Sequence, residues 1–94
     1  MARKIRYSHR FERDYRREKS GQHGKILDEL LMEAVNPLVA DVPLPQKNFD
    51  HALIGDWSDH RDCHIRPDLL LIYRKLDNDH LDLVRLGSHS ELGF

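Results

Sequence analysis

The sequence predicts an α+β domain in which two N-terminal helices pack on one antiparallel sheet. Three observations lead to this class. A short alternating segment opens the chain, two segments with helical periodicity follow, and short apolar runs separated by turn signals occupy residues 56–86. The expected order of elements is therefore β-α-α-β-β-β, within a single domain covering residues 1–94.

The first strand and helix follow from local patterning. Polar and apolar side chains alternate over residues 3–7, as in a half-buried strand. Ser8 suits the N-cap of a helix that runs to about Lys19, because its hydroxyl can accept from a free backbone N–H of the first turn. Phe11 and Tyr15 lie one turn apart, so both are expected on the buried side.

The second helix is expected from about Gln22 to Val35. The residue before a proline disfavours helical dihedrals, so the helix is expected to end at Asn36-Pro37. Residues 37–55 contain three prolines and predict a long irregular connection, a kind of segment that is often functional in small domains. The apolar positions expected to be buried on this helix are Ile26, Leu27, Leu30, Leu31 and Val35.

A strand is expected to resume at Asp56-Trp57 and to continue to about residue 66. Because alternate residues of a strand share a face, Trp57, Cys63 and Ile65 are expected on the apolar side. His64 is expected on the opposite side, where a reactive group remains accessible.

A turn and two further strands complete a predicted meander. The segment Ile65–Asp68 favours a β-turn, since proline suits the second turn position and aspartate the third. His64 and Asp68 are then expected on either side of the turn, within side-chain reach. The apolar run Leu69–Tyr73 and residues 81–86, separated by an Asp/Asn-rich turn signal, predict the last two strands.

Composition favours a soluble globular protein. Of the 94 residues, 39% are hydrophobic and 33% are charged. The single cysteine, Cys63, excludes an internal disulfide and suits a reducing compartment. No apolar run approaches the length needed to span a bilayer, so the expected location is cytoplasmic, without a membrane partner.

Charge is distributed unevenly along the chain. Residues 1–25 contain nine Lys/Arg against three Asp/Glu, whereas the remainder contains six against thirteen. Arg13, Arg16 and Arg17 crowd the polar side of the first predicted helix. They form either an ordinary solvated helix face or a surface for a nucleic-acid backbone or an acidic partner.

Three histidines and one aspartate are placed where the predicted sheet would gather them. His51 is expected in a loop, His64 and Asp68 beside the turn, and His89 just beyond the last strand. In the cleavage of RNA, histidine can act as base toward the 2′-hydroxyl and as acid toward the leaving 5′-oxygen, because its unperturbed pKa lies near neutrality. Asp68 is expected to orient His64. Arg61 and Arg85 are the candidates for holding the phosphate.

Each of these residues has a simpler interpretation. Scattered histidines are more often surface or capping residues, and His9, His23, His60 and His80 are assigned that role. Asp68 is also a suitable turn residue, and Arg61 a suitable partner for an aspartate. A metal site built from His60, Cys63, His64 and His89 is a further alternative, but the CxxC or HxxxH spacing that indicates such sites is missing.

Three segments together resemble a known toxin family. They are DHALIGDW at residues 50–57, RDCHIRPDLLLIY at 61–73 and RLGSH at 85–89. The patterns DHxLxGxW, RDxHxxPDxxLIY and RxGxH are those of the YafQ branch of the RelE toxin superfamily. The resemblance implies a small RelE-like fold, a cognate antitoxin partner, and ribosome-dependent cleavage of mRNA in the A site of the 70S ribosome.

The resemblance also implies the site residues. It assigns catalysis to His51, His64, Asp68 and His89, and substrate support to a C-terminal aromatic residue, here Phe94. In the family pattern the aromatic residue follows the last histidine by four positions, where this chain has Gly93.

The predicted function is therefore that of a type II toxin acting as an endoribonuclease. Acid–base chemistry by histidine would leave a 2′,3′-cyclic phosphate and a 5′-hydroxyl, with neither a metal nor another cofactor. The alternative from a different class is an inactive module of RelE fold that binds only antitoxin or RNA.

Overall fold

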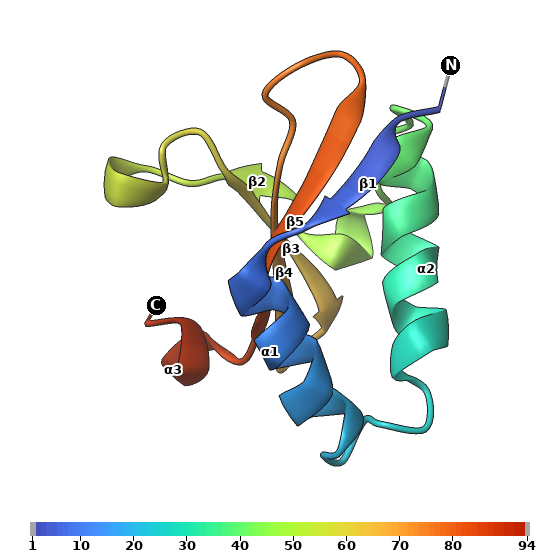
Figure 1. Cartoon of the computed structure of the whole chain (residues 1–94), viewed down its shortest axis with the longest axis vertical. Helices are drawn as coiled ribbons and strands as arrows, with labels where there is room; N and C mark the ends of the chain where they lie inside the picture. Colours follow the sequence, from blue (N-terminus) through green and yellow to red (C-terminus); the bar gives the residue numbers. More distant parts are fainter. Residues whose placement is uncertain (1, 94) are drawn as a thin grey trace.

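The computed structural model describes residues 2–93. Five strands form one sheet in the order β1-β5-β4-β3-β2 (Figure 1). The strands are β1 (Lys4–Tyr7), β2 (His51–Ala52), β3 (Arg61–Arg66), β4 (Leu69–Arg74) and β5 (His80–Gly87). The helices are α1 (His9–Lys19), α2 (Leu27–Val39) and α3 (His89–Leu92), with 3₁₀ turns η1 (Gln46–Asn48) and η2 (Gly55–Trp57).

The predicted α+β class and the β3–β4–β5 meander are confirmed, with one difference in strand direction. Strands β2 to β5 pair antiparallel, but β1 runs parallel to β5 at the edge of the sheet. None of the helices in residues 2–93 is long and apolar enough to cross a bilayer.

Helix α1 begins as expected. Ser8 is its N-cap, and the Ser8 hydroxyl accepts a hydrogen bond from the backbone N–H of Phe11 at 2.9 Å. The helix then lies beside the second half of β5, which β1 leaves uncovered. There the Ser8 hydroxyl also donates to the Val84 carbonyl at 2.6 Å. The helix thus satisfies edge groups of β5 that would otherwise be open to pairing.

Helix α2 differs from the prediction at both ends. Residues 22–26 form turns, so the helix begins at Leu27, and Ile26 is 41% exposed rather than buried. The helix also continues through Pro37 to Val39. Pro37 has no N–H to donate within the helix, but the added turn places Leu38 in the core.

The predicted strand at Asp56-Trp57 is wrong. Gly55 adopts a φ of +69°, which glycine tolerates at little cost, and starts the 3₁₀ turn η2. This segment projects from the body of the molecule (Figure 1), and β3 begins only at Arg61. The irregular connection of residues 37–55 is also more ordered than expected, because it contains η1 and places His51 in the short strand β2.

The sheet has a large core on its helix side and a smaller cluster on the other. Alternate residues of β3 and β4, among them Cys63 and Leu71, face α1 and α2. Burial raises the pKa of the Cys63 thiol, so this residue is an inert part of the core. On the opposite face, Leu70 and Ile72 pack with Leu92 of α3. The candidate site lies on this second face.

Candidate active site

A buried carboxylate, Asp62 of β3, lies at the centre of the candidate site. Its side chain is on the same sheet face as His64, because the two residues are separated by one position in the strand. Asp62 is 4% exposed, and its Oδ1 atom has no hydrogen-bond partner among the described residues. Burial raises the pKa of Asp62, and the nearby histidines His51, His64 and His89 oppose this rise. Three predicted catalytic residues are therefore within electrostatic range of one carboxylate.

His51 is presented by β2, opposite Asp62 in the antiparallel pair. Its Nε2 atom lies 3.7 Å from Asp62 Oδ2, and its Nδ1 atom lies 2.7 Å from the carbonyl oxygen of Phe49. Because a carbonyl can only accept, Nδ1–H is the donor. In the neutral ring Nε2 is then the proton acceptor, and it faces the site.

His64 and His89 face each other although they come from different elements. Their ring centroids are 5.6 Å apart, with the ring planes 72° apart. His89 is the first residue of α3, and this helix is fixed by a capping box in which Ser88 and Glu91 exchange hydrogen bonds. Leu92 anchors the same helix in the second apolar cluster. Helix α3 was not predicted, and it is the element that brings His89 over the sheet.

The expected contact between Asp68 and His64 is not formed. Its Oδ2 atom lies 3.1 Å from His23 Nε2 and accepts a second hydrogen bond from Gln22 Nε2 at 3.1 Å. The chain reverses at Pro67-Asp68, so the aspartate lies at the tip of the β3–β4 hairpin, where the α1–α2 connection supplies its partners. Hydrogen bonding to His23 lowers the pKa of Asp68. His23, which was predicted to be a surface residue, is thus engaged in a specific pair.

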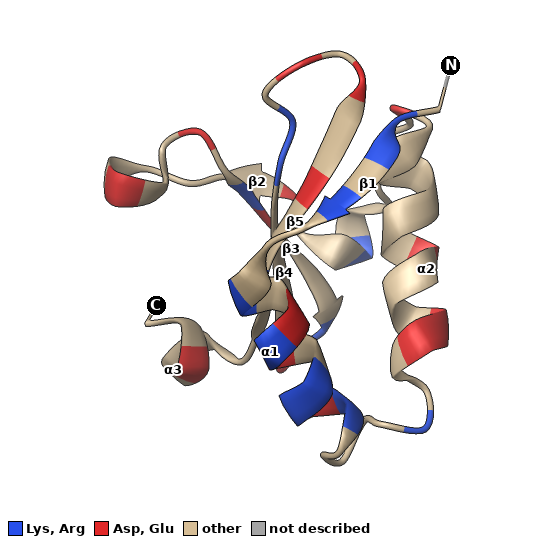
Figure 2. Ribbon diagram, in the orientation of Figure 1, with Lys and Arg blue, Asp and Glu red and all other residues tan. Residues whose placement is uncertain are grey.

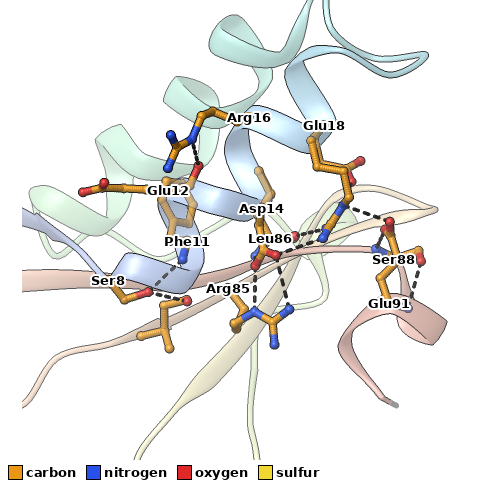
Figure 3. A network of polar contacts seen from close by, with 12 residues as sticks. Ser8, Phe11, Glu12, Asp14, Arg16, Glu18, Arg85, Leu86, Ser88 and Glu91 are labelled. Carbon is orange, nitrogen blue, oxygen red and sulfur yellow. Dashed lines mark hydrogen bonds and ion pairs between the residues drawn. The ribbon is translucent and has the colours of Figure 1, made fainter.

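Arg85 and Arg17, both predicted to bind substrate, are tied to buried Asp14 of α1. Figure 3 shows Arg85 beside Asp14. Arg85 donates from Nε and Nη2 to the two carboxylate oxygens of Asp14, at 2.7 and 3.2 Å. Burial opposes ionisation of Asp14, but hydrogen bonds from Arg85 and from the Leu86 N–H outweigh it and lower the pKa. Arg17 also pairs with Glu91 of α3 at 3.0 Å. These arginines join α1, β5 and α3 rather than standing free.

Arg61 is also engaged, whereas Arg13 is more accessible. Arg61 Nε donates to Asp50 Oδ1 at 3.1 Å, and the Tyr73 hydroxyl donates to the same oxygen. Arg13 is exposed and lines a hollow of about 450 Å³ together with Arg10, Arg17 and Arg85.

The remaining predicted substrate residues are Arg16 and Phe94. Arg16 is exposed on α1, and its Nε atom donates to the Glu12 carbonyl. Figure 2 shows the basic residues of β1 and α1. Phe94 lies outside the described residues.

The alternative metal site is not formed. Cys63 and His64 are adjacent in β3 and project to opposite faces of the sheet, with Cys63 fully buried on the helix side. Within residues 2–93, no group of three or more His, Cys, Asp or Glu side chains is arranged to hold a metal ion.

Comparison with protein families identifies the chain. Residues 3–93 match the family described as the bacterial toxin YafQ of type II toxin-antitoxin systems. The chain belongs to the YafQ toxin family. The expected resemblance is thereby confirmed over almost the whole chain.

Relatives support the YafQ assignment in sequence and structure. The mRNA interferase toxin YafQ of Escherichia coli K12 is 36% identical over 96 residues, covering 98% of this chain and 97% of that protein. YafQ in the E. coli DinJ-YafQ toxin-antitoxin complex superposes with a TM-score of 0.82 at 32% identity, covering 98% of each chain. A metal-bound toxin from Helicobacter pylori superposes with a TM-score of 0.79 at 40% identity, covering 98% of this chain and 99% of that one.

Asp62 is the principal site residue that was missed in the sequence. Strand alternation puts Asp62 on the same face as His64, so the sequence contains a signal for it. That it is buried among three histidines follows only from the positions of β2 and α3, which bring His51 and His89 to it.

Proposed function

We propose that this YafQ-family toxin is an mRNA interferase whose proton transfers are performed by the histidines around Asp62. The observation that supports this most directly is that three histidines from three different elements act on one buried carboxylate. A cluster of this kind provides both an acid and a base for one reaction. Its E. coli relatives are named mRNA interferase toxins, which favours the same substrate.

The proposed reaction is transesterification within the RNA strand. One histidine removes the proton of the 2′-hydroxyl as the 2′-oxygen attacks phosphorus, and a second histidine donates a proton to the 5′-oxygen as the P–O5′ bond breaks. The products are a 2′,3′-cyclic phosphate and a 5′-hydroxyl. His64 and His89 lie close enough to act on one phosphodiester, and His51 offers its Nε2 atom, which lies 3.7 Å from Asp62 Oδ2.

Asp62 is proposed to stabilise positive charge on these rings. A carboxylate held in a poorly solvated position interacts strongly with a neighbouring imidazolium. It therefore favours the protonated ring that acts as acid. Asp68 is retained as a candidate site residue at the tip of the β3–β4 hairpin, where it is held by His23 rather than by His64.

We further propose that the substrate is mRNA in the A site of the 70S ribosome and that a cognate antitoxin inhibits the toxin in the cytoplasm. The basic side of α1, where Arg13 and Arg16 are exposed, suits contacts with a phosphate backbone. The complex of E. coli YafQ with DinJ supports an antitoxin partner for this chain.

Primer extension on a translated message, with and without ribosomes, tests the proposal. We expect cleavage only when ribosomes are present, and 5′-hydroxyl ends that accept phosphate from a polynucleotide kinase directly. Activity should also be retained when zinc and other transition metals are removed while the Mg²⁺ that ribosomes require is kept. The double variant His51→Gln/His64→Gln should be inactive. If the wild-type chain binds an antitoxin but cleaves no message under any condition, the protein is instead an inactive binding module.

A further inference from the structure

We infer that Phe49 forms a stacking platform for an unpaired base of the RNA, next to His64. This inference rests on the proposed function, because it assigns a substrate contact within the same site. Phe49 is 64% exposed, and its ring centroid lies 5.3 Å from that of His64. An aromatic ring left open beside a reactive histidine is well placed to hold the nucleotide on which that histidine acts.

The backbone at Phe49 adopts a strained conformation. Phe49 has a φ of +47°, in the left-handed region that bulky residues rarely adopt. Such conformations persist only when neighbouring contacts enforce them, and they concentrate at functional sites.

The contacts that enforce this conformation come from the site itself. Asn48 Nδ2 donates to the His64 carbonyl at 2.7 Å, and the Phe49 N–H donates to the Gln46 carbonyl at 3.0 Å. His51 donates from Nδ1 to the Phe49 carbonyl at 2.7 Å. The Phe49 backbone is thus held by the His51 ring, and its neighbour Asn48 is held by the backbone carbonyl of His64. The position of Phe49 is coupled to those of the two histidines.

The space beside the ring has the chemistry of a nucleotide site. A cleft of about 680 Å³ lies between α2, η1 and the end of β3 and contains Phe49 and His64. Lys47 and Arg66 on its wall can pair with phosphate, and Asn48 and Glu33 can hydrogen-bond base edges. An apolar peptide would leave these charges unpaired, so the lining favours a single-stranded nucleotide.

The test compares Phe49→Ala and Phe49→Trp with wild type, and Leu76→Ala serves as the matched control. Leu76 is similarly exposed but lies in the β4–β5 loop. Binding is measured to 70S ribosomes that carry a message with 2′-O-methylated nucleotides in the A site, and to ribosomes without message. The methyl groups block attack by the 2′-oxygen, so the readout does not depend on cleavage.

We expect message-dependent binding by the wild-type chain, weakened roughly 5- to 150-fold in Phe49→Ala and largely retained in Phe49→Trp. Leu76→Ala should bind like wild type, and all variants should share its thermal midpoint. Equal binding by Phe49→Ala and wild type, or no gain from the message in the wild-type chain, would overturn the inference.

Parallel cleavage of an unmodified message separates this inference from the proposed function. If wild type and Phe49→Ala cleave and bind equally, the proposed function stands and Phe49 has no part in it. If wild type binds through Phe49 but does not cleave, the platform stands and the proposed activity fails. A Phe49→Ala variant that loses only antitoxin binding would assign the ring to a protein partner instead, and would also overturn the inference.

Discussion

The Nε2 atom of His23 lies 3.1 Å from Asp68 Oδ2 and ties the α1–α2 connection to the tip of the β3–β4 hairpin. The His23 side chain is only 14% exposed, so the pair is partly shielded on the histidine side. Asp68 is thereby directed away from His64, and any part that it plays in cleavage must be played from this position or after leaving it.

We expect Asp68→Asn to lower the free energy of unfolding by up to about 1 kcal/mol at neutral pH, as for other half-exposed pairs. Hydrogen bonding to His23 lowers the pKa of Asp68, so this contribution exists above the ordinary aspartate pKa and disappears as the pH falls through the lowered value. Urea unfolding at pH 7 and pH 3 measures the difference. A double-mutant cycle with His23→Ala should show coupling, and additive effects would mean that the pair contributes nothing.

Asp62→Asn is expected to stabilise the fold while it impairs cleavage. Burial raises the pKa of Asp62, so the ionised carboxylate is disfavoured in the folded state. The free energy of unfolding therefore falls as the pH rises through the raised pKa. The amide removes this cost, so we expect a higher free energy of unfolding than in wild type at pH 7.5, and no difference in acid. Thermal unfolding across pH measures it. A destabilised variant at pH 7.5 would contradict the assigned burial cost.

The long, strongly patterned elements could be predicted from the sequence, but the end of α2 and the short helix α3 could not. Ser8 marked the start of α1 because capping is a local interaction. The end of α2 was missed because burial of Leu38 outweighs the local preference against a helix before Pro37. Helix α3 is only four residues long, and its position depends on Leu92 finding an apolar cluster across the sheet.

The candidate site was predictable in its residue types and less so in its geometry. The sequence motifs identified His51, His64 and His89, and the structure brings all three near Asp62. The predicted partner of Asp68, His64, was wrong, because the turn geometry alone does not reveal His23, which is distant in sequence. The left-handed backbone at Phe49 could not be predicted, because this position holds neither glycine nor asparagine, which adopt that conformation most readily.

We expect His89→Ala to reduce cleavage by roughly 10²- to 10⁴-fold without loss of the fold. His89 is exposed and begins a helix whose cap depends on Ser88 and Glu91, so truncation to alanine leaves no core cavity. Primer extension gives the rate, and growth arrest on expression gives the effect in cells. Ser90→Ala, at the neighbouring exposed position, is the control. An undiminished rate in His89→Ala would remove this histidine from the mechanism.

Arg85→Gln is expected to lower the free energy of unfolding by roughly 1 to 3 kcal/mol, because buried Asp14 loses its bidentate partner and keeps only Arg17 and the Leu86 N–H. The lowered pKa of Asp14 means that its stabilising contribution is present at neutral pH and is lost in acid. The deficit should therefore shrink below about pH 4, where Asp14 can protonate in the variant. Urea titrations at pH 7 and 3.5 test this. An equal deficit at both values would show that packing, rather than charge, is lost.

The arginines of α1 are expected to separate into structural and substrate-binding residues. Arg17 is tied to Asp14 and Glu91, so Arg17→Gln should act mainly on stability. Arg13 and Arg16 are exposed and pair with no carboxylate among the described residues, so each can release a counterion when it binds phosphate. Arg13→Gln and Arg16→Gln should each reduce the log–log salt dependence of ribosome binding by about one unit and leave the thermal midpoint unchanged.

Ribosome sedimentation at several salt concentrations measures the slope, with Lys25→Gln as a control for an equal change in net charge elsewhere on the chain. Lys25 lies in the turn before α2, so its loss should leave the slope as in wild type. If Arg13→Gln and Arg16→Gln also leave the slope unchanged, the polar side of α1 is an ordinary solvated surface. In that case the toxin must reach its message through contacts on the other face of the sheet, around His51, His64 and His89.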